Sequence, residues 1–405
     1  MTDFKKSYFT MNEEQAKEYA QTQLNYFKED AELSCKEIGD GNLNYVFRIV
    51  DEENKDSIIL KQAGPVARIS DEFKVSPDRN RIESDILTIQ YNYVPEYTPK
   101  TYQYDPIMNC FAMEDLSDYT IMRQALMEHQ TFPEFADHIT TFMARTLLLT
   151  SDVVMNHKEK KALVKNFINP ELCEISEDLV YTEPFYQCDR NEVFPKTLPF
   201  VEKEIWQDEK LLLETAKLKF AFMTNAQSLI HGDLHTGSIF IKKNDTKVID
   251  PEFAFYGPAG YDVGNVIANL IFAYANGKAM IADIATQDAF CQYILTTIEQ
   301  VIDLFKTKVE QLWNETEKDR VATYKGFFTY YINGILKDTS AVAGLELSRR
   351  IIGLAKVADI TSIDDEEKRA QAEIQCLTIA KQFILQRETF QTGKDFVDQV
   401  TRVFR

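Results

Sequence analysis

The first quarter of the chain carries short apolar runs bounded by polar turns. Two of these runs, at residues 45–50 and 57–61, flank a polar turn at residues 51–56. Such a pattern predicts two antiparallel strands joined as a hairpin. A further apolar run at residues 110–113 predicts another strand.

Two segments among these runs have helical character. Residues 10–27 form a polar stretch that predicts an N-terminal helix. Residues 81–91 carry Ile82, Ile86 and Ile89 at helical spacing. Strands and helices together predict a small α+β unit in the N-terminal part of the chain.

After Leu116 the pattern changes to long helical stretches, of which residues 132–151 and 209–229 are examples. A proline-bearing segment at residues 169–200 interrupts them and predicts a loop. One strand pair, at residues 238–241 and 247–249, surrounds an Asn-Asp turn. We therefore expect a mainly helical second unit, with the units divided as residues 1–116 and 117–405.

Length, charge and cysteine spacing narrow the class of protein. A chain of 405 residues favours two lobes, and its 64 acidic and 45 basic residues give a net charge of −19. This charge disfavours nucleic acid and anionic membranes as partners. The N-terminus has no apolar targeting segment, and no stretch approaches the roughly 18 apolar residues of a spanning helix, so we expect a cytoplasmic protein. The six cysteines are widely spaced, which predicts free thiols rather than a zinc site.

The strongest chemical signal is His-Gly-Asp-Leu-His at residues 231–235, followed by Asp250-Pro-Glu252. The first motif follows a predicted helix and the second follows the predicted hairpin, so their carboxylates can converge. Phosphoryl transfer needs such carboxylates, one to accept the proton of the attacking hydroxyl and others to hold magnesium against ATP.

The motif at residues 231–235 resembles the catalytic loop of the aminoglycoside phosphotransferase and choline kinase relatives of protein kinases. The Asp-x-Glu form of the second motif is similar to that of the 5-methylthioribose kinase family. The resemblance implies a bilobal protein-kinase-like fold, with an antiparallel sheet in the small lobe, Asp233 as the catalytic base and Asp250 as a metal ligand. It usually places Asn where this chain has Ser238, so Ser238 and Glu252 are both candidates to complete the metal shell.

Upstream residues fit a nucleotide site in the 1–116 lobe. Gly39, Gly41, Asn42 and Asn44 precede the first predicted strand, where a phosphate-covering hairpin is expected. Lys61 ends the next apolar run, and a charge there needs a partner. Glu83 on the following helix is the natural partner, and Asp85 is a rival for that role.

Glu114 and Leu116 lie where the small unit gives way to the helical one. The resemblance implies that their backbone groups contact the adenine edge. It also implies that Asp262, which could cap the next helix, braces the catalytic loop. His231 is expected to order this loop rather than to act as a base.

Arg349 and Arg350 stand beside an apolar helical run in the 117–405 lobe. The 5-methylthioribose kinase family carries paired arginines in its C-terminal region that bind the sugar, so the resemblance implies this role. The alternative is a pair of surface charges, because adjacent helical side chains diverge by about 100°.

The function implied by the resemblance is transfer of the ATP γ-phosphate, with Mg²⁺, to the 1-hydroxyl of 5-methylthioribose in methionine salvage, by a homodimer. One alternative is another small-molecule kinase, acting on an aminoglycoside, choline or homoserine. The arginine pair favours a neutral or anionic acceptor rich in hydroxyls. Another alternative, motivated by Ser238, is a pseudokinase that binds the nucleotide without turnover.

Overall fold

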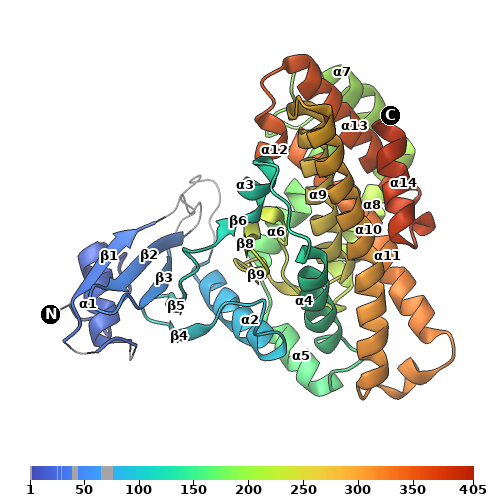
Figure 1. The fold of residues 1–405 in the computed structure, drawn as a ribbon. Coiled ribbons are helices and arrows are strands. Elements are labelled where there is room, and N and C mark those ends of the chain that lie inside the picture. Colours follow the sequence, from blue (N-terminus) through green and yellow to red (C-terminus); the bar gives the residue numbers. More distant parts are fainter. Residues whose placement is uncertain (1, 25, 29, 39–43, 65–75) are drawn as a thin grey trace.

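The structure is a computed structural model, and it describes residues 2–24, 26–28, 30–38, 44–64 and 76–405. A β-sheet with two helices forms the N-terminal part, and a larger body of helices forms the rest (Figure 1). This is the α+β, bilobal architecture that the sequence predicts; the boundary at residue 116 stays a prediction. The N-terminal elements are α1 (Glu13–Thr22), β1 (Leu33–Glu37), β2 (Asn44–Asp51), β3 (Ser57–Ala63), α2 (Arg79–Tyr93), β4 (Thr101–Asp105) and β5 (Cys110–Glu114).

The N-terminal sheet has five strands in the order β1-β2-β3-β5-β4, with antiparallel neighbours throughout. Strands β2 and β3 confirm the predicted hairpin, and β5 confirms the third predicted strand. Lys61 lies on the central strand β3, opposite Val46 on one side and Phe111 on the other. The apolar pattern misses β1 and β4, whose sequences are short and largely polar.

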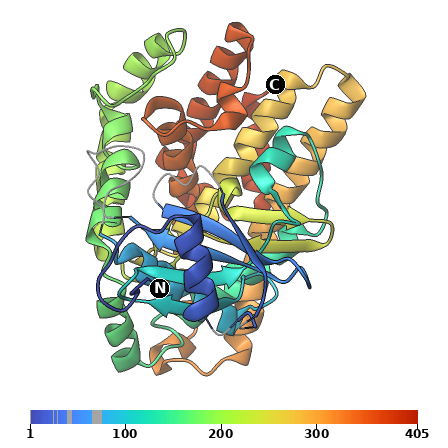
Figure 2. The same ribbon diagram turned by 90° about the vertical axis from the view of Figure 1, so that its left-hand side faces the viewer.

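Helix α1 packs against β1 and β2 and crosses the sheet (Figure 2). It is shorter than the predicted helix at residues 10–27. It begins at Glu13 because Asn12 and Gln15 form a capping box, in which each side chain bonds the other's backbone amide.

Helix α2 lies between the sheet and the helical body, and it confirms the helix predicted at residues 81–91. Its Leu87 packs against Phe111 of the sheet. Its Ile82 and Ile86 pack against Leu229 and Tyr256 of the helical body. Apolar residues on different faces of one helix therefore connect the two parts of the molecule.

Within the described residues, the helical body also contains two small sheets and several short helical turns. Its helices are α3 (Met122–Met127), α4 (Phe135–Leu149), α5 (His157–Asn166), α6 (Pro170–Leu179), α7 (Leu198–Val201), α8 (Glu209–Thr224), α9 (Gly260–Met280), α10 (Ile284–Glu315), α11 (Phe327–Ile352), α12 (Ala358–Thr361), α13 (Glu366–Leu385) and α14 (Gly393–Val403). Its strands and short turns are β6 (Thr120–Ile121), β7 (Ser228–Ile230), β8 (Ile239–Lys242), β9 (Asp245–Val248), β10 (Phe255–Gly257), η1 (Glu183–Phe185), η2 (Glu202–Trp206), η3 (Thr236–Ser238), η4 (Arg320–Thr323) and η5 (Arg387–Thr389). The two small sheets are β7 with β10 and β6-β8-β9.

Helix α9 forms the centre of this body and is buried on nearly all sides. It packs against α10, α11 and α13. Small residues make the close approach possible: an added Cβ at Gly264 would lie 2.7 Å from the carbonyl oxygen of Thr339 on α11. The position of α9 is thus fixed by the main apolar core.

The structure corrects the end of one predicted helix and the interpretation of one predicted loop, and it confirms the predicted hairpin in the helical body. The helix predicted at residues 209–229 ends at Thr224, because residues 228–230 pair with β10 as strand β7. The segment at residues 169–200, predicted as a loop, contains α6, which begins at Pro170. Proline suits a first helical position, where no amide donor is needed. The β8–β9 hairpin turns at Asn244, whose φ of 59° is left-handed.

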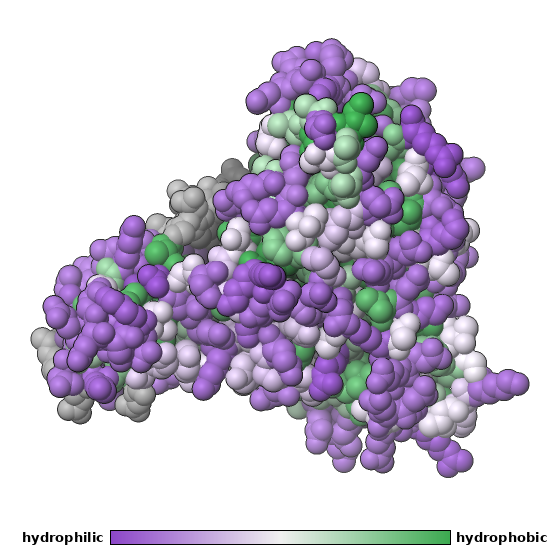
Figure 3. All heavy atoms as spheres, in the orientation of Figure 1, coloured by the Kyte–Doolittle hydropathy of each residue, from purple (hydrophilic) through white to green (hydrophobic). Residues whose placement is uncertain are grey.

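One exposed face is mainly polar and the cysteines are unpaired, as the amino-acid composition and the cysteine spacing predict. The face in Figure 3 is mainly hydrophilic. Among the described residues, none of the helices has both the length and the apolar character needed to cross a bilayer. All six cysteines fall within these residues and are free thiols, as predicted.

Two glycines of α11 provide a matched test of this packing. We expect Gly344→Ala to destabilise the protein by about 1–3 kcal/mol through overpacking, because the new Cβ would lie 2.6 Å from the carbonyl oxygen of Ala380. Gly334→Ala on the same helix meets nothing within 4 Å, and it should stabilise by about 0.5–1 kcal/mol through helix propensity. Urea unfolding of both variants makes the comparison; equal effects would contradict the proposed close contact of α11 with α13.

Candidate active site

Lys61 of β3 makes two ion pairs in the buried part of the sheet. Its Nζ lies 2.7 Å from Oε1 of Glu83 on α2, and it also contacts Oδ1 of Asp250. Burial alone would lower the pKa of Lys61, but the carboxylates of Asp250 and Glu83 outweigh burial and raise it. Burial also raises the pKa of Glu83, and the charge of Lys61 opposes that rise. The lysine is therefore held as a cation beside Asp250.

Asp85, the rival partner of Lys61, points elsewhere. Its Oδ2 lies 2.9 Å from Nη1 of Arg81, one helical turn away on α2. The structure thus brings Lys61 to Glu83 and not to Asp85.

Pairing of β7 with β10 brings the segment at residues 231–235 beside the segment at residues 250–254. Ile230 lies opposite Phe255, so the loop that leaves β7 runs next to the residues that enter β10. Gly232 has a φ of +83°, and a Cβ there would lie 2.3 Å from the carbonyl oxygen of Phe253. Both the conformation and the lack of space require glycine at this position.

Asp262 holds the same loop from the side of the core. Its carboxylate accepts hydrogen bonds from the backbone amides of His231 at 2.8 Å and Gly232 at 3.0 Å. The predicted bracing contact is therefore present. The predicted cap is wrong: α9 begins at Gly260, so Asp262 lies inside the first turn, and its side chain serves the loop instead of the helix end.

His231 ties the loop to the residue before Asp250. Its Nε2 donates to the carbonyl oxygen of Ile249 at 2.9 Å, and its Nδ1 accepts from the amide of Asp233 at 3.2 Å. These bonds agree with the predicted ordering role. Asp250 has a φ of 67°, an uncommon value for aspartate that is often found at functional sites.

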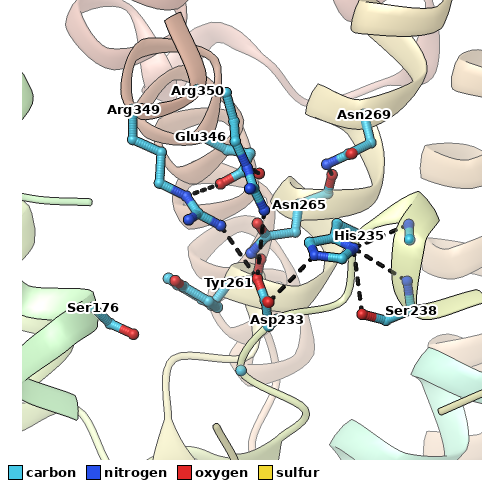
Figure 4. Close-up of polar contacts among 12 residues, drawn as sticks. Ser176, Asp233, His235, Ser238, Tyr261, Asn265, Asn269, Glu346, Arg349 and Arg350 are labelled. Atoms are coloured by element: carbon cyan, nitrogen blue, oxygen red, sulfur yellow. Dashed lines mark hydrogen bonds and ion pairs between the residues drawn. The ribbon is translucent and has the colours of Figure 1, made fainter. Parts of the chain in front are cut away.

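Asp233 faces the two arginines of α11 (Figure 4). Its Oδ1 lies 3.2 Å from Nη2 of Arg349 and 3.9 Å from Nη2 of Arg350. The arginines are 9% and 8% exposed. The alternative interpretation of this pair as surface charges is therefore wrong.

The surroundings of Asp233 keep it ionised. Burial would raise the pKa of Asp233, but His235, Arg349 and Arg350 together hold it well below its ordinary value. Burial lowers the pKa of His235, so this imidazole is neutral near pH 7. The two guanidinium groups are then the cations that stabilise the carboxylate.

The hydroxyl of Ser238 faces His235, whereas its carbonyl oxygen accepts from the amide of Ile249, directly before the Asp-x-Glu motif, at 3.0 Å. The Ser238 hydroxyl is 3.3 Å from Nδ1 of His235, which also accepts from the amides of Gly237 at 3.0 Å and Ser238 at 3.1 Å. With Nδ1 as an acceptor, Nε2 carries the proton and faces Asp233 at 3.3 Å. The role of Ser238 as a metal ligand stays a prediction and needs its hydroxyl to turn from His235.

Glu252 connects the helical body to the sheet. Its Oε2 accepts from Nδ2 of Asn44 at 3.1 Å and lies 3.5 Å from Nε of Arg79. Burial, followed by the negative charge of Asp250, raises the pKa of Glu252 to about 7. The positive charges of Lys61 and Arg79 oppose this rise. Glu252 therefore belongs to the same charged cluster as Asp250 and Lys61.

The remaining predicted nucleotide contacts are only partly described. Gly39, Gly41 and Asn42 lie outside the described residues. Glu114 ends β5 and donates its amide to the carbonyl oxygen of Lys100 at 2.9 Å. The carbonyl oxygen of Leu116 accepts from the amide of Tyr119 at 2.9 Å. Their predicted contacts with adenine stay predictions.

Sequence reasoning missed Arg79, His235 and Glu346. Glu346 is 1% exposed and bonds both arginines of the pair. A signal was available, because Glu346 stands three and four residues before the pair. Arg79 has no such local signal, since its partner Glu252 is remote in the sequence.

These groups form one continuous charged site. The negative charge of Asp233 acts to raise the pKa of Asp250, so the base candidate and the metal candidate interact. Lys61 contacts Asp250, and the arginines contact Asp233. Phosphoryl transfer uses groups of these kinds: a cation that binds phosphates, carboxylates that bind a metal ion, and a carboxylate that accepts the proton of the attacking hydroxyl.

Comparison with known proteins gives consistent matches. The model of the phosphotransferase enzyme family matches residues 177–292. A protein described as methylthioribose kinase from Geobacillus sp. (strain WCH70) is 43% identical, over 92% of this chain and 91% of its own. Another from Geobacillus kaustophilus (strain HTA426) is 41% identical, over 92% of each chain. A solved choline kinase from Cryptosporidium parvum Iowa II matches with a TM-score of 0.52 and 14% identity, over 93% of this chain and 98% of that chain. This structural likeness shows a shared kinase-like fold.

Proposed function

This chain belongs to the methylthioribose kinase family, and we propose that it transfers the γ-phosphate of ATP to the 1-hydroxyl of 5-methylthioribose, in methionine salvage. The observation that carries the proposal is the contact of both Arg349 and Arg350 with Asp233. Two arginines suited to bind a sugar therefore contact the carboxylate that is suited to accept the proton of its hydroxyl.

The acceptor site is formed by Asp233, Arg349 and Arg350. A furanose offers several hydroxyl oxygens with lone pairs, and planar guanidinium groups can donate to neighbouring hydroxyls in a fixed geometry. With the ring held, one hydroxyl faces Asp233 and the γ-phosphate, which makes the reaction effectively intramolecular.

The nucleotide site is formed by the sheet and the segment that follows it. Lys61, paired with Glu83 at 2.7 Å, is placed to bind the α- and β-phosphates. Gly39, Gly41, Asn42 and Asn44 are proposed to cover the phosphates. Backbone groups of Glu114 and Leu116 are proposed to contact the adenine.

Magnesium is proposed to bind Asp250 and Glu252, with Ser238 as a further candidate ligand. The fit rests on hard oxygen donors and on the mutual charge that raises the pKa of Glu252 to about 7. Among the described residues, no group of three or more acidic, His or Cys side chains could form an all-protein metal cage. Magnesium commonly takes one or two carboxylates plus phosphate oxygens, so it would neutralise charge on the transferred group here.

The alternative acceptors and the pseudokinase fit the site less well. A cationic acceptor such as choline needs carboxylates, whereas two buried arginines face Asp233. A pseudokinase would lack a complete metal shell, whereas Glu252 supplies a second carboxylate beside Asp250.

The deciding experiment is a coupled ADP-release assay with 5-methylthioribose, choline, homoserine and kanamycin as acceptors. Turnover with 5-methylthioribose above all others supports the proposal, and phosphorus NMR of the product should place the phosphate on the 1-hydroxyl. Turnover with another acceptor alone would overturn the substrate, and nucleotide binding without any turnover would favour the pseudokinase. The homodimer and the cytoplasmic location stay predictions, of which sedimentation can check the first.

Replacement of the proposed base should separate binding from turnover. Asp233→Asn should keep ATP affinity but lower turnover by about two to four orders of magnitude, since an amide cannot accept the proton of the hydroxyl. Calorimetric ATP titration and the ADP-release assay measure the two effects. Turnover within a few-fold of the wild type would remove Asp233 from the catalytic role.

Magnesium titrations should identify the metal ligands. Asp250→Asn and Glu252→Gln should each raise the magnesium concentration for half-maximal activity, because each removes a negative charge from the proposed ligand shell. Asp85→Asn is a matched control, since that carboxylate pairs with Arg81 outside the cluster. A response of Asp250→Asn alone would leave Glu252 without a metal role.

Loss of either arginine should affect the acceptor and not the nucleotide. A hydrogen bond with a charged partner contributes about 1.5–3 kcal/mol, so Arg349→Ala and Arg350→Ala should lower kcat/KM for the sugar roughly ten- to a hundredfold. The KM for ATP should barely change. Arg369→Ala is the control, as this helical arginine pairs with Glu373 away from Asp233. Unchanged sugar kinetics in both variants would contradict the acceptor role.

A further inference from the structure

Glu346 lies on α11 one turn before the arginine pair and contacts both of its members. Its Oε1 lies 2.9 Å from Nε of Arg350, and its Oε2 contacts Nε of Arg349. We propose that Glu346 is a positioning residue that aims both guanidinium groups at the acceptor beside Asp233. This inference rests on the proposed function and adds a residue to it.

Helix geometry explains why one carboxylate can serve two arginines. Side chains of adjacent helical residues diverge by about 100°, so Arg349 and Arg350 alone would point to different sides. Glu346 stands at both i−3 and i−4 from the pair, and side chains at these spacings share a helix face. Each carboxylate oxygen therefore takes one Nε and draws the two arginines together, as Figure 4 shows.

The contact uses only the Nε atoms and leaves the terminal nitrogens to the site. Nη2 of Arg349 lies 3.2 Å and Nη2 of Arg350 lies 3.9 Å from the same oxygen of Asp233. Both guanidinium groups thus reach one point from one helix. A sugar hydroxyl near Asp233 would find donors from both.

Glu346 also balances charge in a buried place. Two adjacent cations with exposures of 9% and 8% repel each other and need anionic partners. Burial would raise the pKa of Glu346, but Arg349 and Arg350 lower it to about 2. The carboxylate is therefore ionised at all pH values at which the enzyme would work. Without it, both cations would pair more strongly with Asp233, which would then be less available to a hydroxyl.

The test compares Glu346→Gln with Glu373→Gln in the full chain. Glutamine keeps the size of the side chain but replaces one acceptor oxygen with a donor. Glu373 is the matched control, because it is 2% exposed and pairs with Arg369 at 3.0 Å with the same helical spacing, but on α13. We expect Glu346→Gln to lower kcat/KM for 5-methylthioribose ten- to a hundredfold with the KM for ATP within twofold, and Glu373→Gln to change neither. Glu346→Asp, which keeps the charge on a shorter arm, should restore part of the loss.

A double variant and the control variant distinguish a positioning role of Glu346 from a merely structural one. If Glu346 acts through the arginines, the loss in Glu346→Gln combined with Arg350→Ala should be clearly smaller than the two single losses multiplied together, because only Arg349 is then left to position; fully additive losses would overturn the proposal. An equal loss in Glu373→Gln, or an equal loss for ATP, would mean a merely structural role and would also overturn it.

A substrate-free readout separates this inference from the proposed function. The Nε–Hε NMR signals of Arg349 and Arg350, assigned with Arg349→Lys and Arg350→Lys, should shift and exchange faster with water in Glu346→Gln. Unchanged signals would overturn the positioning role. If the wild type phosphorylated none of the acceptors, the proposed function would fail, yet these signals would still decide whether Glu346 holds the pair.

Discussion

The hydrogen bonds from the amides of His231 and Gly232 to Asp262 are the contact on which the rest of the site depends. They join the loop that carries Asp233 to α9, which lies in the middle of the apolar core. A loop held only by its own residues would sample many conformations. Here the position of the loop is set by the packing of α9 against its neighbours, so apolar burial far from the chemistry fixes a polar site.

The same constraint places the second motif. Gly232 approaches Phe253 so closely that a Cβ would lie 2.3 Å from its carbonyl oxygen. His231 reaches across to Ile249, directly before Asp250. Because the loop is anchored to the core on one side and to residues 249–253 on the other, a shift of either motif moves the other as well. The separation of the base candidate from the metal candidates is thereby set by short-range contacts.

Much of this arrangement could be predicted where it depends on local patterns. The β2–β3 hairpin and the Lys61–Glu83 pair follow from a strand, a following helix and the need to pair a buried charge. The strand β7 could not be predicted, because residues 228–230 become a strand only through pairing with β10.

Contacts between remote residues also lay beyond the sequence pattern. Glu252 meets Asn44 and Arg79 because the sheet and the helical body dock at this point, and no spacing in the sequence records that docking. The role of Glu346 is partly visible in the sequence and partly dependent on the fold. Its spacing to the arginines is visible, but a helical Glu-Arg pair is usually a surface ion pair, and only the fold shows that this one is buried.

The low pKa of Asp233 constrains how this carboxylate can assist the reaction. Burial would raise the pKa, but His235, Arg349 and Arg350 keep it well below the ordinary value, so Asp233 is a weak base. A strong base is not required when the transition state is loose, because bond formation to the attacking oxygen, and with it loss of the proton, comes late. Asp233 would then orient the hydroxyl and receive its proton late in the step, and alignment of reacting groups can lower a barrier by several kcal/mol, up to about 7–11 in favourable cases. The arginines that weaken the base are the groups proposed to fix the acceptor, so base strength and alignment are opposed in this site, and the geometry favours alignment.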